Sequence, residues 1–315
     1  MINYLYCFDY NYNIQALCSM YSLLEQSSEK LNIDIIHNDP STFKKIYSIV
    51  LKHPFLNELK IHEFKNSGID FPNVTGTHIS EATYYRLFIE DYLSSKNKYY
   101  VYMDADIICH KDPTQSVNAS LFDLESTKYT ISVKTEHRKT KNSEEMFKRL
   151  SLAGSTYFNA GVMLINYKKW KKDNLTSKLT TKMNILGDTI VFWDQDVLNS
   201  YFDGEYLELN NNLNYNLHLT EENSKKKIVK QALNEMILIH YSGSFKPWTT
   251  RGAVEKNALM YMENFRKLGM GKFHLTHTWK MSSIFYIIKS IINLKVINTK
   301  APFKFLISFI RSLQD

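Results

Sequence analysis

The sequence lacks the features that define several large classes of protein. Its 315 residues include only three cysteines, an odd number without a C-x-x-C pair, which predicts free thiols in a reducing compartment rather than a disulfide framework. The first residues lack the basic segment and the apolar run of a signal peptide. No run reaches the roughly 18 uncharged apolar residues that a transmembrane helix needs. We therefore expect a cytoplasmic protein.

Three glycine-rich motifs of well-known enzyme classes are also absent. The sequence has no G-x-x-x-x-G-K-[ST] loop and no G-x-G-x-x-G loop, which disfavours P-loop enzymes and dinucleotide-binding enzymes. It has no G-x-S-x-G elbow, which disfavours an α/β hydrolase. If this chain binds a diphosphate, a metal ion has to neutralise it, as in nucleotide-sugar transferases.

Positive charge is concentrated at the end of the chain. The sequence has 39 Lys and Arg against 32 Asp and Glu, a net charge of +7, yet residues 271–315 contain seven Lys or Arg and a single acid. The first 270 residues are therefore nearly neutral, which argues against nucleic acid as a partner. We divide the chain into a main domain, residues 1–270, and a basic C-terminal segment, residues 271–315.

The C-terminal segment has the pattern of amphipathic helices at a membrane surface. Ile284, Ile288 and Ile291 recur at helical spacing, and Pro302 separates them from a second apolar run, residues 303–313. Aromatic and apolar residues mixed with lysines are typical of helices that lie on anionic membranes. This pattern predicts peripheral association with the inner membrane surface. The alternative is that these helices pack on the main domain.

Short apolar runs alternate with stretches of helical spacing in the main domain. The expected strands are 4–8, 33–36, 99–103, 160–165 and 236–240, and the expected helices are 14–24, 43–51 and 81–93. This alternation predicts an α/β fold with a mostly parallel central sheet and helices on both faces. Ligands of such sheets bind beyond the carboxyl ends of the strands, so polar residues that follow apolar runs are the candidate site residues.

Two aspartates directly follow the strand expected at 99–103. In extended chain, Asp104 and Asp106 point the same way, and paired carboxylates suit Mg²⁺ or Mn²⁺. The triplet alone is weak, because 32 acidic residues in 315 give about three such triplets by chance, and a solvated turn is the alternative. His240 closes another strand and would favour Mn²⁺ as a third ligand. A core histidine is the alternative there.

Further candidate residues flank other predicted elements. The polar ones are Asn159, Asp194, Gln195 and Lys246, and the small residue Gly161 would allow close approach to a ligand. Lys246 could neutralise phosphate, or it could be a surface lysine before a proline turn. An N-terminal helix cap is the alternative for one of Asp194 and Asp196.

Six segments then occur in a characteristic order. They are Asp9-x-Asn11-Tyr12, His78-Ile-Ser-x-x-Thr83-Tyr-x-Arg86, Tyr102-Met-Asp-Ala-Asp106, Phe158-Asn-Ala-Gly161 through Trp170, Asp194-Gln-Asp-x-Leu-Asn199, and His240-Tyr-x-Gly-x-x-Lys-Pro-Trp248. Together they resemble glycosyltransferase family 8, which includes bacterial lipopolysaccharide α-galactosyltransferases and α-glucosyltransferases. The resemblance covers residues 3 to about 250 and implies a GT-A fold.

The resemblance also implies the reaction and a role for each matching residue. A retaining, Mn²⁺-dependent enzyme would move galactose or glucose from a UDP-hexose to a cell-surface glycan or glycolipid such as lipopolysaccharide, with Mg²⁺ as a substitute metal. The implied metal ligands are Asp104, Asp106 and His240, and the implied donor-binding residues are Asp9, Asn11, Tyr12, Arg86, Asp104, Asn159, Gly161, Gly243 and Lys246. The implied acceptor residues are His78 and Gly243, and the implied catalytic residues are Gln195 and Asp194.

Several alternatives remain open at this point. The amide of Gln195 is a poor nucleophile, which favours front-face substitution, and a covalent intermediate on Asp194 is the alternative. Ser242 and Phe192-Trp193 depart from the family pattern near the acceptor side, so the acceptor does not follow from the resemblance. The alternative functions are a transferase that acts on a protein or another polymer, and an inactive nucleotide-sugar-binding protein.

Overall fold

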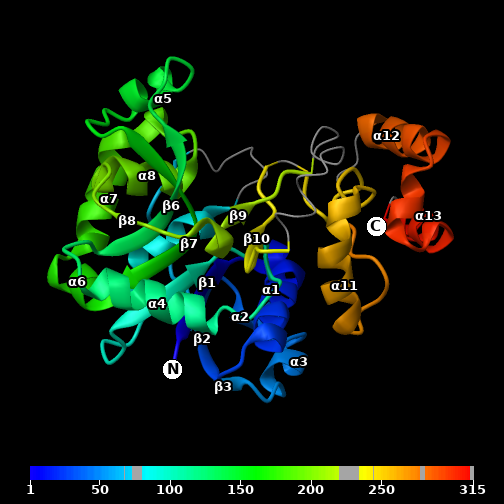
Figure 1. The fold of residues 1–315 in the computed structure, drawn as a ribbon, viewed down its shortest axis with the longest axis horizontal. Helices are drawn as coiled ribbons and strands as arrows, with labels where there is room; N and C mark the ends of the chain where they lie inside the picture. The colour runs from blue at the N-terminus through cyan, green and yellow to red at the C-terminus, as the bar shows by residue number, and fades with distance from the viewer. Residues whose placement is uncertain (67, 73–79, 220–233, 244, 277–280, 313–315) are drawn as a thin grey trace.

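The protein is built around a seven-stranded sheet, shown in Figure 1. The computed structural model describes every residue except 67, 73–79, 220–233, 244, 277–280 and 313–315. The strand order is β3-β2-β1-β4-β7-β6-β8. The strands are β1 (Asn3–Phe8), β2 (Leu31–His37), β3 (Leu56–Glu63), β4 (Tyr99–Met103), β6 (Ile131–Arg138), β7 (Thr156–Asn166) and β8 (Leu207–Glu208).

This sheet is mostly parallel, as predicted. β1 pairs in parallel with β2 and β4, β2 with β3, and β6 with β8. β7 is the exception, because it runs antiparallel to both of its neighbours, β4 and β6. The start of β7 therefore lies at the same edge of the sheet as the carboxyl ends of β1 and β4.

A second, three-stranded sheet has the order β5-β10-β9. It consists of β5 (Ile107–Cys109), β10 (Leu238–His240) and β9 (Tyr215–Asn216). β10 is antiparallel to β5 and parallel to β9. The strand expected at 236–240 is therefore shorter than predicted and lies outside the central sheet, because its edge pairs with the short strand that follows Asp106.

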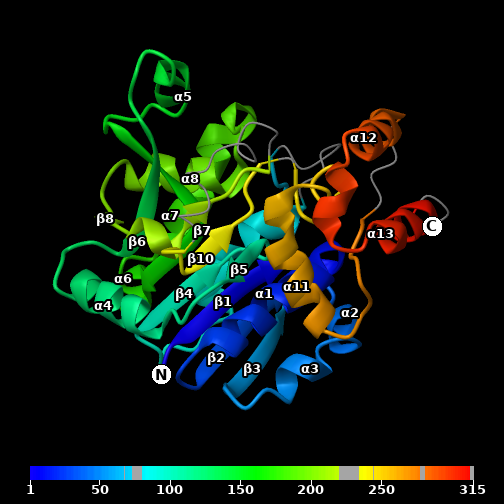
Figure 2. The same ribbon diagram turned by 45° about the vertical axis from the view of Figure 1, so that its right-hand side comes forward.

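Helical segments cover both faces of the central sheet, as predicted (Figure 2). Tyr4 and Tyr6 of β1 lie in one buried core with helix α1, whereas Leu5 and Cys7 lie in the other with η2 and α8. Such a strand reads as a continuous apolar run because both of its faces are buried. The helices are α1 (Asn13–Gln26), α2 (Pro40–Lys44), α3 (Ser48–Leu51), α4 (Thr114–Glu125), α5 (Glu144–Arg149), α6 (Tyr167–Lys172), α7 (Leu175–Leu186), α8 (Trp193–Phe202), α11 (Leu259–Lys267), α12 (Met281–Ile292) and α13 (Pro302–Arg311), and the 3-10 segments are η1 (Tyr10–Tyr12), η2 (Glu81–Asp91), η3 (Gly187–Thr189), η4 (Asn211–Leu213), η5 (Lys256–Ala258) and η6 (Lys295–Thr299).

Two predicted helices differ from the observed elements. The helix expected at 43–51 is divided into the short helices α2 and α3. The helix expected at 81–93 is the 3-10 segment η2, in which Phe88 has non-helical angles (φ −106°, ψ 19°). Nearly every residue of η2 from Ala82 to Ile89 is buried, so packing on all sides overrides the amphipathic helical pattern.

The C-terminal helices α12 and α13 lie at one side of the molecule, away from α5 (Figure 1). Ile287, Phe305 and Phe309 are buried in the same core as α1. The Tyr286 hydroxyl donates to Glu255 Oε1 at 2.6 Å. One face of this segment therefore packs on the rest of the protein. None of the helices in the described residues combines the length and the hydropathy needed to cross a membrane.

Candidate functional site

The candidate site lies where β1 and β4 end and β7 begins. Asp9 follows β1 and Asp104 follows β4, and the backbone N–H of Asp104 donates to the carbonyl of Gly161 in β7 at 2.9 Å. Asp9, Arg86, Asp104 and Asp106 line a cavity of about 120 Å³ at this edge. The sheet edge that was expected to bind ligand is therefore the edge that carries the polar cavity.

Pairing of β10 with β5 in the second sheet brings His240 to the aspartates. His240 lies opposite Ile107 in the antiparallel pair of β10 and β5, and the N–H of Tyr241 donates to the carbonyl of Asp106 at 3.1 Å. Ligand atoms of Asp104, Asp106 and His240 all lie within 4.8 Å of one another. The structure thus brings together the three residues predicted to hold a metal.

Gly161 is needed because the His240 ring lies against it. A Cβ atom at position 161 would lie 2.4 Å from Cε1 and 2.6 Å from Nδ1 of His240. Those distances are far below van der Waals contact, so a side chain here would force the imidazole to move. The small residue at position 161 therefore allows the close approach of the His240 side chain.

A chain of hydrogen bonds fixes the orientation of the His240 ring. The N–H of Gly161 donates to Oδ1 of Asn159 at 3.0 Å, and Nδ2 of Asn214 donates to the same oxygen at 2.9 Å. Oδ1 of Asn214 therefore faces Nδ1 of His240, 3.2 Å away, and accepts its proton. In the neutral ring, Nε2 then presents its lone pair to the aspartates, which is the tautomer that binds a metal.

The acceptor atoms of this cluster fit a divalent cation. Oδ1 of Asp106 is buried and accepts no hydrogen bond from any described residue, and it lies 3.3 Å from Nε2 of His240. Because Oδ1 of Asp106 and Nε2 of His240 would both present lone pairs, a cation bound to both atoms would stabilise them. Two carboxylates and one imidazole suit Mn²⁺, and Mg²⁺ less closely.

Arg86 connects the aspartate cluster to helix α8. Its guanidinium is 2.8 Å from Oδ1 of Asp104 and 2.7 Å from Oδ2 of Asp194, and it donates to the carbonyl of Ala160 at 2.5 Å. It also stacks on the ring of Tyr102 at 3.9 Å. Burial disfavours the charge, but Asp104 and Asp194 outweigh it and raise the pKa of Arg86. The side chain is therefore a permanent, buried cation.

Lys246 neutralises the other aspartate of the pair. Its ammonium lies 2.6 Å from Oδ2 of Asp106 and donates to the carbonyl of Tyr241 at 2.6 Å. Burial alone would raise the pKa of Asp106, but the charge of Lys246 outweighs it and holds that pKa well below its usual range. Asp106 is therefore ionised at neutral pH.

The Asp194-Gln195-Asp196 run at the start of α8 has divided roles. Asp194 lies beside Arg86 and accepts a hydrogen bond from the Thr83 hydroxyl. Burial raises the pKa of Asp194 to about 6 in spite of Arg86. Asp196 is fully buried and accepts from the N–H groups of residues 191 and 192, from the Tyr157 hydroxyl and from Arg149, so it holds the start of the helix. The N-cap residue of α8 is nevertheless Phe192, so the capping alternative is wrong for both aspartates.

Gln195 contacts Glu136, a residue that the sequence motifs did not identify. Its Oε1 accepts from the N–H of Ala160 at 3.0 Å, and its Nε2 lies 3.3 Å from Oε2 of Glu136. Amides of Asn159 and Asn216 also donate to the Glu136 carboxylate, at 3.3 and 3.0 Å. Glu136 lies at a register shift between β6 and β7, where a bulge turns a side chain out of the regular alternation. The sequence contains no motif around Glu136, and only prediction of this bulge could have identified the residue.

Asp9 and Tyr12 line the same cavity as Asp104 and Asp106. The Asp9 carboxylate accepts from the backbone and side-chain amides of Asn11 at 3.0 and 3.1 Å. Tyr12 contacts Trp248 edge to face, with ring centroids 6.2 Å apart. Gly243 has a positive φ of 83°, which glycine adopts without strain. His78 lies outside the described residues.

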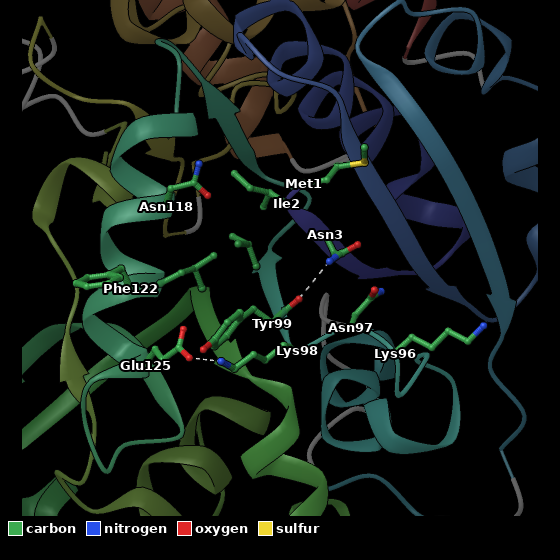
Figure 3. Close-up of a pocket in the computed structure, with 12 residues that line it drawn as sticks. Met1, Ile2, Asn3, Lys96, Asn97, Lys98, Tyr99, Asn118, Phe122 and Glu125 are labelled. Carbon is green, nitrogen blue, oxygen red and sulfur yellow. Dashed lines mark hydrogen bonds and ion pairs between the residues drawn. The ribbon is translucent and has the colours of Figure 1, made fainter.

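A second cavity, of about 370 Å³, lies at the opposite ends of β1 and β4 (Figure 3). Its lining includes Phe122 of α4 and the ion pair of Lys98 with Glu125. Asn3 donates to the carbonyl of Tyr99 there at 3.5 Å. The cluster of metal-ligating groups found in the described residues lies at the other end of the sheet, so we assign the functional site there.

Comparison with known proteins shows what this chain is similar to. The family model described as glycosyl transferase family 8 matches residues 3–252. A lipopolysaccharide 1,2-glucosyltransferase of Escherichia coli is 29% identical over 252 residues, which cover 76% of this chain and 71% of that protein. A lipopolysaccharide 1,3-galactosyltransferase of Salmonella typhimurium is 30% identical over 174 residues, or 55% of this chain and 50% of that protein.

The fold is also similar to that of solved structures. A crystal structure of the galactosyltransferase LgtC, in complex with donor and acceptor sugar analogues, matches with a TM-score of 0.67 and 20% identity. The match covers 90% of this chain and 100% of that chain. The fold of this protein is therefore of the GT-A type, as predicted from the sequence.

Replacement of Gly161 by Ala should weaken metal binding. The added methyl group displaces the His240 ring, so we expect the affinity for Mn²⁺ to fall about tenfold or more, as when the support of a metal ligand is lost. Titration of Mn²⁺ with detection of the free ion by electron paramagnetic resonance measures the loss. If the clash with the ring is the cause, His240→Ala should cost the Gly161→Ala protein little further affinity. Unchanged affinity in Gly161→Ala would contradict the assigned role.

Replacement of Asp194 by Asn should stabilise the fold above pH 6. Because the pKa of Asp194 is about 6 in the folded protein and about 3.9 when unfolded, the folded state binds more protons between these values. The free energy of unfolding therefore falls as the pH rises from 4 to 6, by at most about 3 kcal/mol. Asp194→Asn should remove that loss, and urea unfolding at pH 5 and pH 8 measures it.

The matched control is Asp188→Asn, because Asp188 is an exposed aspartate in the turn that precedes α8. This variant should keep the pH dependence of the wild type. Lower stability of Asp194→Asn than of the wild type at pH 8 would show that the ionised carboxylate stabilises the fold.

Proposed function

Because the chain belongs to glycosyl transferase family 8, as its motifs predicted, we propose that it moves galactose or glucose from a UDP-sugar to a cell-surface glycan such as lipopolysaccharide or lipooligosaccharide. The chain is a glycosyltransferase related to lipopolysaccharide hexosyltransferases. The observation that carries the proposal is the grouping of Asp104, Asp106 and His240 beside a polar cavity at the carboxyl ends of β1 and β4.

The three ligands would hold Mn²⁺ against the diphosphate of the donor. When bound, the metal supplies Lewis-acid stabilisation of the leaving nucleotide. Lys246, beside Asp106, adds a point charge for the same phosphates. Asp9, Asn11 and Tyr12 are the residues we assign to the uridine. In this proposal, Lys246 and the metal neutralise the diphosphate, which a glycine-rich loop binds in the enzyme classes excluded above.

The hydrogen bonds of Gln195 and Asp194, the two candidate catalytic residues, support front-face substitution with retention. Gln195 is held at both ends of its amide, by the N–H of Ala160 and by the Tyr157 hydroxyl, 3.2 Å from Nε2. The two oxygens of Asp194 face Thr83 and Arg86. Neither side chain is free to attack the anomeric carbon. In front-face transfer, the leaving phosphate oxygen takes the proton of the acceptor hydroxyl.

We further propose that α12 and α13 attach the enzyme to the cytoplasmic face of an anionic membrane. Their buried faces pack on the protein, but Phe285, Ile292 and Phe303 are 66, 74 and 82% exposed. Lys289 and Lys304 are exposed on the same two helices. A surface that combines large apolar side chains with lysines matches the boundary between lipid headgroups and acyl chains. Such attachment would hold the active site near a lipid-linked acceptor.

The donor and the metal requirement can be tested in one assay. The purified protein is incubated with a panel of nucleotide sugars, with and without Mn²⁺, and nucleotide release is measured. We expect release from one UDP-hexose that depends on the metal. Asp106→Asn should lower this activity at least about a hundredfold, because it removes a charged ligand from the metal. The control, Asp123→Asn, changes an exposed aspartate of α4 and should be fully active. Metal-independent turnover by Asp106→Asn would refute the metal assignment.

The membrane proposal predicts the effect of surface substitutions on vesicle binding. In the variant Phe285→Ser/Ile292→Ser/Phe303→Ser, we expect binding to vesicles with anionic lipid to fall about tenfold or more, since each large apolar side chain contributes about 1.5–3 kcal/mol when fully buried. Co-sedimentation measures the change. Phe122→Ser, which alters an equally exposed aromatic residue (73%) of α4, is the matched control. Equal sedimentation of the triple variant and the wild type would exclude this surface.

A further inference from the structure

The two aspartates of the metal cluster are each neutralised by a cation, and the two cations are held in different ways. Arg86 is 4% exposed and lies between two carboxylates, a carbonyl and the ring of Tyr102. A planar guanidinium fixed from several sides cannot leave without leaving the buried carboxylate of Asp194 unpaired. Arg86 is therefore a permanent part of the site.

Lys246 is held more loosely than Arg86. Its side chain is 19% exposed, and its ammonium has two partners, Oδ2 of Asp106 and the carbonyl of Tyr241, each at 2.6 Å. Lysine carries its charge on a flexible stem with rotatable bonds. The ammonium can therefore leave Asp106 by rotation of the side chain.

The backbone of Lys246 is fixed while its side chain can rotate. Its carbonyl accepts from the N–H of Thr249 at 3.0 Å and from the Thr249 hydroxyl at 2.8 Å. A Cβ atom at Gly252 would lie 2.0 Å from the same carbonyl oxygen, so the turn is tightly packed. Movement of the ammonium therefore requires no movement of the main chain.

We propose that Lys246 substitutes for the metal in the free enzyme and couples the binding of metal to the binding of nucleotide. Its ammonium pairs with the Asp106 carboxylate until metal and nucleotide bind. It then moves from that carboxylate to the diphosphate of the nucleotide. This inference rests on the proposed function, because it needs a nucleotide diphosphate as the second anion.

The exchange makes metal binding depend on the nucleotide. A divalent cation that binds alone has to displace an ammonium from Asp106 and leave it beside the new charge. When the diphosphate is present, Lys246 gains an anionic partner as it loses Asp106. Each ligand therefore raises the affinity for the other, by the same factor. The enzyme would therefore bind the metal more weakly without the nucleotide than with it.

The test is the affinity of Lys246→Met for Mn²⁺ alone. The exchange predicts that this affinity rises, whereas a purely supporting role for Lys246 predicts that it falls. Without the competing ammonium, the affinity for Mn²⁺ alone should rise about tenfold, whereas the affinity for UDP at saturating Mn²⁺ should fall about tenfold. Electron paramagnetic resonance measures free Mn²⁺, and calorimetry measures UDP binding. At about 1 M salt the Debye length is about 3 Å, so an effect that persists there arises from direct contact.

Two variants serve as controls. Lys246→Arg keeps the positive charge and should remain near the wild type for Mn²⁺ alone. Lys256→Met removes an exposed lysine of η5 and should change neither affinity. If Lys246→Met does not fold, Lys246→Gln removes the same charge and carries the same expectation.

The outcomes separate this inference from the proposed function. If Lys246→Met binds Mn²⁺ alone as the wild type does, Lys246 acts only on phosphate and the exchange is refuted. If the variant binds Mn²⁺ more weakly, Lys246 supports the cluster structurally and the exchange is again refuted, while the transferase assignment stands. If the wild type binds no Mn²⁺ even with UDP, both proposals fail.

Discussion

The buried guanidinium of Arg86 is the interaction on which the rest of the site depends. It lies between Asp104 at the end of β4 and Asp194 at the start of α8, and it also binds the carbonyl of Ala160 in β7. Without this cation, the buried carboxylate of Asp194 and the partly exposed carboxylate of Asp104 would repel each other, and each would lose charge stabilisation. Arginine suits the position because its planar fork can serve several acceptors at once while it stacks on Tyr102. One side chain thus fixes Asp104 and Asp194 relative to each other.

The direction of one strand explains how the other half of the site is assembled. In a fully parallel sheet, the residues that open a strand lie at the edge opposite to the ligand. Because β7 runs antiparallel to β4, its opening residues meet Asp104, and the carbonyl of Gly161 accepts the Asp104 N–H. The second sheet then brings His240 against Gly161, where only a hydrogen atom fits. Three segments far apart in sequence therefore meet at one edge.

Local sequence patterns predicted what local physics determines. The apolar runs of β1, β2 and β4 and the aspartates that follow β4 were identified correctly, because a strand buried on both faces and the acids at its end are adjacent in sequence. The strand of His240 was placed in the wrong sheet, because its pairing with β5 is a long-range contact. Asn214 and Glu136 were missed, since an isolated amide or carboxylate carries no motif and gains its role from neighbours brought by folding. Asp194 and Asp196 could be separated only by their partners.

The hydrogen-bond chain that begins at the N–H of Gly161 connects His240, a proposed metal ligand, to Asn159, which we assign to the donor, and to Glu136. A backbone N–H is an unambiguous donor, so it fixes Oδ1 of Asn159 as an acceptor, and this in turn fixes the amide of Asn214 and the tautomer of His240. The other end of the Asn159 amide donates to Glu136. Each amide both donates and accepts, so rotation of one reverses the requirements of the next. If Asn159 binds the donor sugar and His240 the metal, as we propose, a substitution at Asn159 or Glu136 would also change the orientation of the His240 lone pair. Donor selectivity and metal affinity would then change together.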